Sequence, residues 1–307
     1  MGAGWVAGVI RARALVSLCA GAYAGREPAA CATLGEALRS LATTPYGRRL
    51  HAESELADVQ RAVSATLLWQ LRVLAGWLPR SGADLLRPLA AGFEIANVEA
   101  RLRSFSGAPE PAPYRLGTLG TAWRRLQHAG TPAELRSALA SSPWGDPGAD
   151  TPRAVLTTLR MAAADQVCRT VGPARRWAVG RAALLTAREH YVCGRPLPGP
   201  ARTHAVRLLG SRAVDATDFG DFRRRLPATA RWAVDGIADP HELWQAEARW
   251  WQVLADDGAG LLRIPRHGHA PVVGAVAVLS ADAWRVRAGL ELAARGGGSL
   301  EVLDAIV

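Results

Sequence analysis

The sequence predicts an all-α fold, on grounds of composition, periodicity and repeated spacing. Of the 307 residues, 49% are hydrophobic, which provides enough apolar side chains for a substantial core. Aromatic residues make up only 6%, β-branched residues are sparse, and the helix formers Ala, Leu and Arg dominate. A chain of this length can form two domains or one long body built from repeats.

The first apolar segment, residues 5–15, is expected to form a helix of the core. Arg11 and Arg13 precede an apolar stretch over 14–24 that ends Ala-Tyr-Ala, as in a secretory signal peptide. A signal peptide begins with a charged segment, whereas the residues before these arginines are apolar, so we favour the core helix. The longest apolar run, 270–279, is too short for a membrane span, and we expect no crossing of a bilayer.

Two amphipathic helices are expected next, over 56–78 and 93–105. In the first, apolar residues recur in steps of three and four, which places them on one face: Leu56, Val59, Val63, Leu67, Leu71, Leu74 and Leu78. Acids at Glu53, Glu55 and Asp58 suit the N-terminal end of a helix. Pro79 ends this helix, and a linker rich in Gly and Pro over 107–113 follows the second.

The C-terminal third repeats this pair. A helix expected over 241–254 carries Leu243, Trp250 and Leu254 on one face, so we expect Trp250 in the core. A last helix is expected over 279–293. Glu55 aligns with Glu242 at a separation of 242 − 55 = 187 positions, and Glu94 aligns with Asp282 at 282 − 94 = 188. Nearly equal separations for two helix pairs favour a duplicated unit.

A middle copy fits between them. Leu38-Arg39-Ser40, leading to Thr44-Pro45-Tyr46-Gly47, recurs as Leu135-Arg136-Ser137, leading to Ser142-Pro143-Trp144-Gly145, at a separation of 135 − 38 = 97. A helix over 177–190 is the counterpart of the helix over 93–105. We therefore expect three helical repeats, at 1–108, 109–210 and 211–307. The alternative is that Leu-rich amphipathic helices align by chance.

The net charge of +10 comes entirely from arginine, because the sequence contains no lysine. Such a balance can indicate nucleic acid or an anionic membrane surface. The arginines are scattered along the chain, with no run longer than 223–225, so we expect a solvated basic surface and no nucleic-acid binding. Cys19, Cys31, Cys168 and Cys193 lack the spacing of a metal site or a disulfide framework, and buried free thiols are expected.

Candidate catalytic, cofactor and metal sites were sought among acids, histidines and glycines, and none is predicted. Asp256-Asp257 does not recur one helical turn away, as magnesium-binding acids would, and Gly258-Ala259-Gly260 marks a helix end. His267 and His269 lack a third ligand and are expected in an exposed loop.

Three further patterns fail as motifs. His241-Glu242 has Gln245 where a zinc protease has its second histidine. Gly296-Gly297-Gly298 follows a helix and so cannot direct helix N–H groups toward a phosphate. Tryptophans on the predicted helices are expected in the core, with a Trp-lined pocket as the alternative: Trp69, Trp77, Trp244, Trp250, Trp251 and Trp284.

Segments across the whole chain resemble one family. They are Trp5 to Leu15 with its Arg11-x-Arg13 pattern, Glu94-Ile-Ala-Asn97-Val98, the helix over 241–254, and the closing helices over 271–307. Together they resemble the C subunit of prokaryotic V-type (A/V-type) ATPases, the counterpart of the eukaryotic d subunit. Arg285 departs from this pattern, because the third repeat is expected to have Asn there.

The resemblance implies a non-catalytic adaptor whose three-fold pseudo-repeat of helical bundles forms a funnel-shaped single body. Such a protein sits on the cytoplasmic face of the cell membrane and couples the central shaft to the proteolipid ring of a rotary ATPase. It needs no cofactor, metal or small-molecule substrate. The alternatives are an α-helical repeat scaffold for other protein partners and a helical lipid or terpenoid enzyme.

Overall fold

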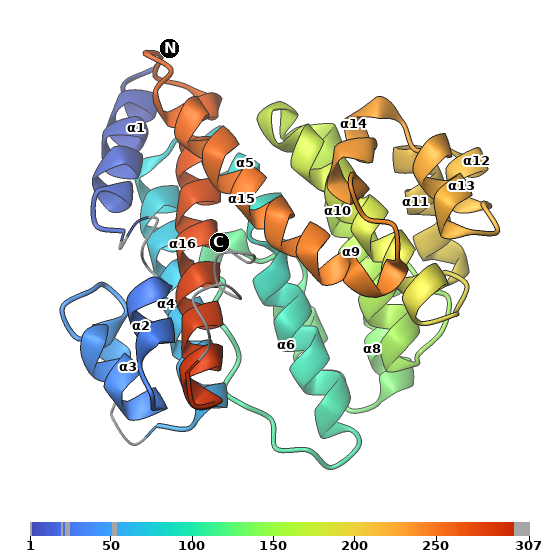
Figure 1. The fold of residues 1–307 in the computed structure, drawn as a ribbon, viewed down its shortest axis with the longest axis horizontal. Helices are drawn as coiled ribbons and strands as arrows, with labels where there is room; N and C mark the ends of the chain where they lie inside the picture. The colour runs from blue at the N-terminus through green and yellow to red at the C-terminus, as the bar shows by residue number, and fades with distance from the viewer. Residues whose placement is uncertain (1, 20, 22–24, 51–53, 298–307) are drawn as a thin grey trace. The chain divides into compact units, whose positions relative to one another are not determined.

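A computed structural model describes residues 2–19, 21, 25–50 and 54–297, and over these ranges it contains helices and turns without any strand (Figure 1). The prediction of an all-α fold is confirmed. Predicted features at Ala22-Tyr23-Ala24, Glu53 and 298–307 lie outside the described residues. The chain divides into two compact units, unit 1 with 1–82 and 248–307, and unit 2 with 83–247. The three sequence repeats have other bounds and stay a prediction.

Unit 1 is assembled around its C-terminal helix, α16 (His269–Ala294), drawn in red in Figure 1. The most extensive contacts of α16 are with these helices: α1 (Ala3–Val16), α2 (Arg26–Ala30), α3 (Leu34–Ser40) and α4 (Leu56–Trp77). The predicted apolar stripe of α4 is buried at Val59 and Val63, which belong to one hydrophobic cluster with Val286 and Leu290 of α16. The helix predicted over 56–78 is therefore confirmed.

The chain before α2 crosses α16 with backbone against backbone. A Cβ atom at Gly289 would lie 2.4 Å from the carbonyl oxygen of Gly25, and one at Gly25 would lie 2.5 Å from that of Arg285. Real Cβ atoms do not approach this closely, so glycine is required at both positions.

We expect Gly289→Ala to lower the free energy of unfolding by about 1–3 kcal/mol, because the added methyl group meets backbone that cannot turn aside. Denaturant unfolding followed by circular dichroism measures the change. The matched control is Gly76→Ala near the end of α4, where a Cβ has nothing within 4 Å and should be neutral or stabilising. Equal unfolding midpoints for Gly289→Ala and the parent would contradict the close crossing.

Unit 2 is centred on α9 (Pro152–Thr170), whose most extensive contacts are with these helices of the same unit: α6 (Ala91–Ser104), α10 (Arg175–Ala187) and α11 (Gly199–Leu209). The helix predicted over 177–190 corresponds to α10 and a short π-helix, Arg188–Val192. Shorter helices complete the unit: α7 (Trp123–Leu126), α8 (Pro132–Ala140), α12 (Ser211–Val214), α13 (Phe219–Arg225) and α14 (Ala228–Arg231).

Two helices carry the chain from one unit to the other, α5 (Arg80–Leu89) and α15 (Leu243–Leu262). The predicted end of α15 at Gly258-Ala259-Gly260 is wrong, because the helix continues through these residues. Gly258 instead allows close packing within unit 1. A Cβ atom at Gly274 of α16 would lie 2.5 Å from the carbonyl oxygen of Gly258. No helix within the described residues has the length and apolar character needed to span a bilayer.

Candidate functional site

The structure builds the same hydrogen-bonded turn twice, once in each unit. Each segment consists of a short helix and the turn that follows it. We name them turn 1 (residues 33–47, which include α3) and turn 2 (residues 131–145, which include α8). Each opens with a variant of the capping box. The threonine hydroxyl accepts from the N–H three residues later, and the glutamate at that position accepts from the N–H of the residue before the threonine instead of the threonine's own. In turn 1, Thr33 Oγ1 accepts from the Glu36 N–H at 3.2 Å, and Glu36 accepts from the Ala32 N–H at 3.1 Å. In turn 2, Thr131 and Glu134 make the equivalent bonds, at 3.2 and 2.7 Å.

The two turns also close alike. The Thr44 and Ser142 hydroxyls each donate to a carbonyl three residues earlier at 2.7 Å. Each hydroxyl also accepts a bond from the N–H two residues later, that of Tyr46 or Trp144. Equivalent residues are separated by 131 − 33 = 98 positions, so the sequence alignment of the Leu-Arg-Ser triplets at 97 is wrong by one residue. The alignment matched identical residue types, whereas the capping threonines set which backbone positions are equivalent.

Each turn presents an aromatic donor to a buried carboxylate on a long helix of its own unit. Tyr46 Oη donates to Asp282 Oδ2 of α16 at 2.7 Å. Trp144 Nε1 donates to Glu94 Oε1 of α6 at 2.8 Å. Glu94 and Asp282 are only 1% and 2% exposed, and they are the pair aligned in the sequence at 188 positions.

Backbone N–H groups also donate hydrogen bonds to these carboxylates. Asp282 Oδ1 accepts from the Gly21 N–H at 2.9 Å. Glu94 accepts from the Thr121 and Ala122 N–H groups at 2.6 and 2.8 Å. A buried charge is tolerated only when such bonds replace its hydration. Both carboxylates therefore hold the turns in place.

Burial, together with the neighbouring Asp282, raises the pKa of the Tyr46 hydroxyl well above its usual value near 10. Tyr46 therefore stays protonated as the hydrogen-bond donor to Asp282 over the whole physiological range of pH.

The position three residues after each carboxylate is not duplicated. Asn97 Nδ2 donates to the carbonyl of Tyr114 at 3.0 Å, and the Tyr114 N–H donates back to Asn97 Oδ1 at 2.7 Å. This pair fixes the loop after α6 to the helix. Arg285 stands at the equivalent place on α16 and cannot accept such a bond, because guanidinium groups only donate.

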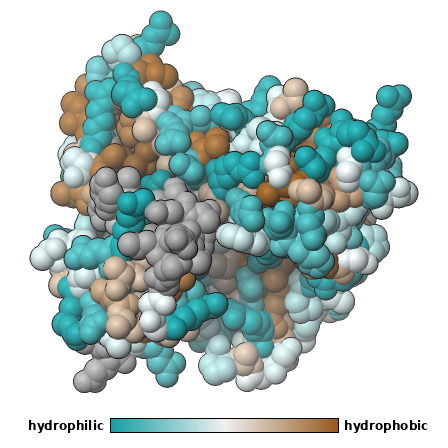
Figure 2. All heavy atoms as spheres, viewed as in Figure 1, coloured by the Kyte–Doolittle hydropathy of each residue, from teal (hydrophilic) through white to brown (hydrophobic). Residues whose placement is uncertain are grey.

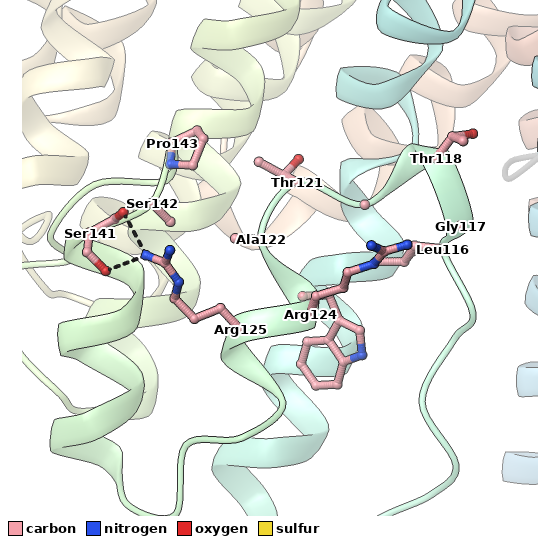
Figure 3. A pocket seen from close by; sticks show the side chains of 12 residues that line it. Leu116, Gly117, Thr118, Thr121, Ala122, Arg124, Arg125, Ser141, Ser142 and Pro143 are labelled. Atoms are coloured by element: carbon pink, nitrogen blue, oxygen red, sulfur yellow. Dashed lines mark hydrogen bonds between the residues drawn. The ribbon is translucent and has the colours of Figure 1, made fainter.

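A pocket of about 590 Å³ lies beside turn 2 (Figure 3). Its walls include Leu116, Arg124, Arg125, Ser142 and Pro143. The guanidinium of Arg125 points toward Ser141, and its Nη1 donates to the serine carbonyl at 3.2 Å and to the hydroxyl at 3.1 Å. The guanidinium of Arg125 is thus already bonded to protein.

A second pocket, of about 450 Å³, lies at the equivalent place beside turn 1 in unit 1. Thr43, Thr44 and Pro45 occupy the positions that Ser141, Ser142 and Pro143 hold in the other pocket. The remaining walls come from α1, the residues just after it, turn 1 and its continuation, and α4: Arg11, Leu15, Leu18, Arg48, Thr66, Trp69 and Gln70. Sequence analysis did not single out Gln70, whose position on α4 has no motif.

A third buried acid, Asp165 of α9, was also missed. It is 2% exposed and lies 2.7 Å from His204 Nδ1 and 2.9 Å from Arg207 Nη1, both on α11. These contacts join two helices of unit 2. Spacing could not reveal them, since the partners lie 39 and 42 residues away in the sequence.

The acids and histidines tested in the sequence do not come together as a site. Asp256 and Asp257 lie within α15 and not at its end, which corrects the expectation for them. His267 lies in a loop, but His269 is the first residue of α16, and its ring lies 4.7 Å from that of Trp5. His241 lies in a 3-10 helix, Pro240–Glu242. Across the described residues, no three His, Cys, Asp or Glu side chains form a group that could hold a metal ion.

The expectation that the six helical tryptophans fill the core is wrong, because three are exposed and Trp250, Trp251 and Trp284 are only half-buried. Trp69, Trp77 and Trp244 are 43%, 54% and 46% exposed. Trp250 is half-buried and meets Trp251 edge to face at 5.0 Å, so its expected core position is also wrong. Residues at helical spacing share a face, but spacing alone cannot say whether another element covers that face.

The four cysteines are free, as expected, but none is fully buried. Cys193 is exposed, and the other three are half-buried. Burial and the nearby Asp282 raise the pKa of the Cys19 thiol. Cys19 is therefore held as a neutral thiol, which is a poor nucleophile.

The geometry thus defines a helical protein whose buried acids stabilise turns. A scan against known protein families finds no match, and a search of curated proteins finds no relative.

Proposed function

We propose that this chain is the non-catalytic central-stalk adaptor of a V-type rotary ATPase or ATP synthase. It couples the central shaft to the membrane proteolipid ring, as a peripheral protein on the cytoplasmic face of the cell membrane. The observation that carries the proposal is the duplicated turn with its buried carboxylate. Glu94 and Asp282 stiffen helical units, and torque transfer requires a body that is packed and poorly compressible.

The same proposal includes a three-fold pseudo-repeat forming a funnel-shaped body. Turns 1 and 2 supply two copies. A third candidate begins at Asp218, whose side chain accepts from the Asp221 N–H at 2.7 Å, in the manner of the two threonine caps. Phe222 and Leu226, four and eight residues after the cap, are buried like Leu135 and Leu139 of turn 2. This copy falls within 211–307, where the third repeat is expected.

The basic charge supports a place beside anionic lipid. Arginines near such a surface contribute about 1 kcal/mol each, and the net charge is +10. The test is co-expression with the shaft and ring proteins of a V-type ATPase, followed by affinity purification and membrane flotation. We expect recovery with the coiled-coil shaft, membrane association only when the ring is present, and no nucleotide hydrolysis by the isolated chain. A monomer indifferent to both shaft and ring would overturn the proposal.

A helical scaffold for other protein partners is the second candidate, and exposed apolar side chains on unit 1 favour it. Figure 2 shows hydrophobic atoms gathered over the part of unit 1 that contains α1. Val6 and Ile10 of α1 are 37% and 60% exposed, and α4 adds the exposed Trp69 and Trp77. Capture of the same partner in the absence of any rotary component would favour this candidate.

A further inference from the structure

We propose that the pocket beside turn 1 binds an N-acylated α-amino acid with a free carboxylate and an apolar side chain. Two sources share this chemistry, a free N-acyl amino acid and the last residue of a peptide chain. The pocket lies wholly within unit 1, and the proposal does not depend on the rotary role.

The pocket contains a buried acceptor that no protein group satisfies. Gln70 is 2% exposed, and its Oε1 has no hydrogen-bond partner. Buried polar groups in folded proteins are almost always paired, and leaving one unpaired costs stability. The oxygen itself has almost no accessible surface, so a ligand N–H, such as the amide of an acylated amino acid, reaches it only when the Gln70 side chain turns toward the pocket that it lines.

Two guanidinium groups line the same pocket. Arg11 Nε is buried without a partner, and its guanidinium carbon lies 5.9 Å from the centroid of the Trp77 ring. Arg48 is exposed, and the lining contains no Asp or Glu to neutralise either charge. Guanidinium groups bind carboxylates through paired N–H donors. The positive wall therefore selects a ligand with a carboxylate.

The remaining wall is apolar. Leu15 is buried, whereas Leu18 and Trp69 are 61% and 43% exposed and leave apolar surface for a ligand to cover. An N–H donor, a carboxylate and an apolar side chain radiate from one carbon atom in an N-acylated amino acid. One such molecule can therefore present a donor to Gln70, a carboxylate to the two arginines and an apolar side chain to the apolar wall.

The pocket beside turn 2 is a natural comparison, because it has the same turn but lacks the unsatisfied hydrogen-bonding groups. Its Arg125 is bonded to Ser141, and none of the described buried groups without a partner lies in its lining. We therefore assign ligand binding to the pocket beside turn 1 alone.

The test is isothermal titration of the full chain with N-acetyl-L-leucine, against N-acetyl-L-leucinamide, which lacks the carboxylate, and L-leucine, which lacks the acyl group. We expect the first compound to bind at least about tenfold more tightly than either of the others, since a bond to a charged group is worth that much. A six-residue peptide ending in leucine, with and without a C-terminal amide, distinguishes the sources. Preference for the free-acid peptide over N-acetyl-L-leucine indicates a chain end, and the reverse indicates a small molecule.

Three variants localise the site. Arg48→Met and Gln70→Leu should each weaken binding of N-acetyl-L-leucine by about tenfold, whereas Arg125→Met in the other pocket should leave it unchanged. Gln70→Leu should not lower the melting temperature, because it removes an unsatisfied buried acceptor. If Gln70→Leu fails to fold, the exposed Arg48 still decides the matter. Equal affinity for the acid and the amide, or unchanged binding by Arg48→Met, would overturn the proposal.

Discussion

Glu94→Leu is expected to lower the free energy of unfolding by about 3–5 kcal/mol. The substitution leaves three donors without an acceptor, the Thr121 and Ala122 N–H groups and the Trp144 indole. Each unpaired buried donor costs about 1–3 kcal/mol, although part of this cost is recovered because the two backbone N–H groups are only partly buried. The leucine side chain also has to fill a polar site at the contact between α6 and turn 2.

Chemical denaturation followed by tryptophan fluorescence measures this change. Glu99→Leu on the same helix is the matched control, because Glu99 makes an exposed ion pair with Arg160 that is worth at most about 1 kcal/mol. Glu94→Gln keeps one carbonyl oxygen as an acceptor and should fall between the two. If Glu94→Leu and Glu99→Leu were equally stable, the Glu94 carboxylate would not be holding turn 2.

Helix positions were the features that the sequence could reveal, because they depend on local periodicity. The stripe from Leu56 to Leu78 predicts α4, and Pro79 predicts its end. The end of α15 could not be predicted in this way. Glycine commonly marks the end of a helix. Gly258 instead lies inside α15, where its close contact with Gly274 of α16 requires a residue without a side chain.

The candidate site was only half accessible from the sequence. Alignment paired Glu94 with Asp282 and turn 1 with turn 2, but it could not show that each acid bonds its turn. Tyr46 and Asp282 are separated by 236 residues, and only the packing of turn 1 on α16 brings them together. The unsatisfied oxygen of Gln70 carries no sequence signal at all, since whether a side chain has a partner depends on every neighbouring element.

Asp282→Leu is expected to destabilise unit 1 by about 3–5 kcal/mol, and Tyr46→Phe by about 1.5–3 kcal/mol, because the hydroxyl donates to a charged acceptor. The double variant should lose less than the sum, since a phenylalanine in place of Tyr46 leaves no hydroxyl to be orphaned when the carboxylate is removed. The double-mutant cycle should therefore give a coupling energy of about 1–3 kcal/mol. Additive losses would show that the bond contributes nothing specific.

The same bond predicts sensitivity to alkaline pH. The pKa of Tyr46 is raised in the folded protein, so the folded state retains a proton that the unfolded chain releases above about pH 10. The stabilisation by this bond is complete below that pH and is lost as the pH rises. Tyr46→Phe has no such proton, so its free energy of unfolding should fall less steeply between about pH 9.5 and 11 than that of the parent. Parallel pH profiles would mean that Tyr46 titrates normally, and the hydrogen bond to Asp282 would then not survive in solution.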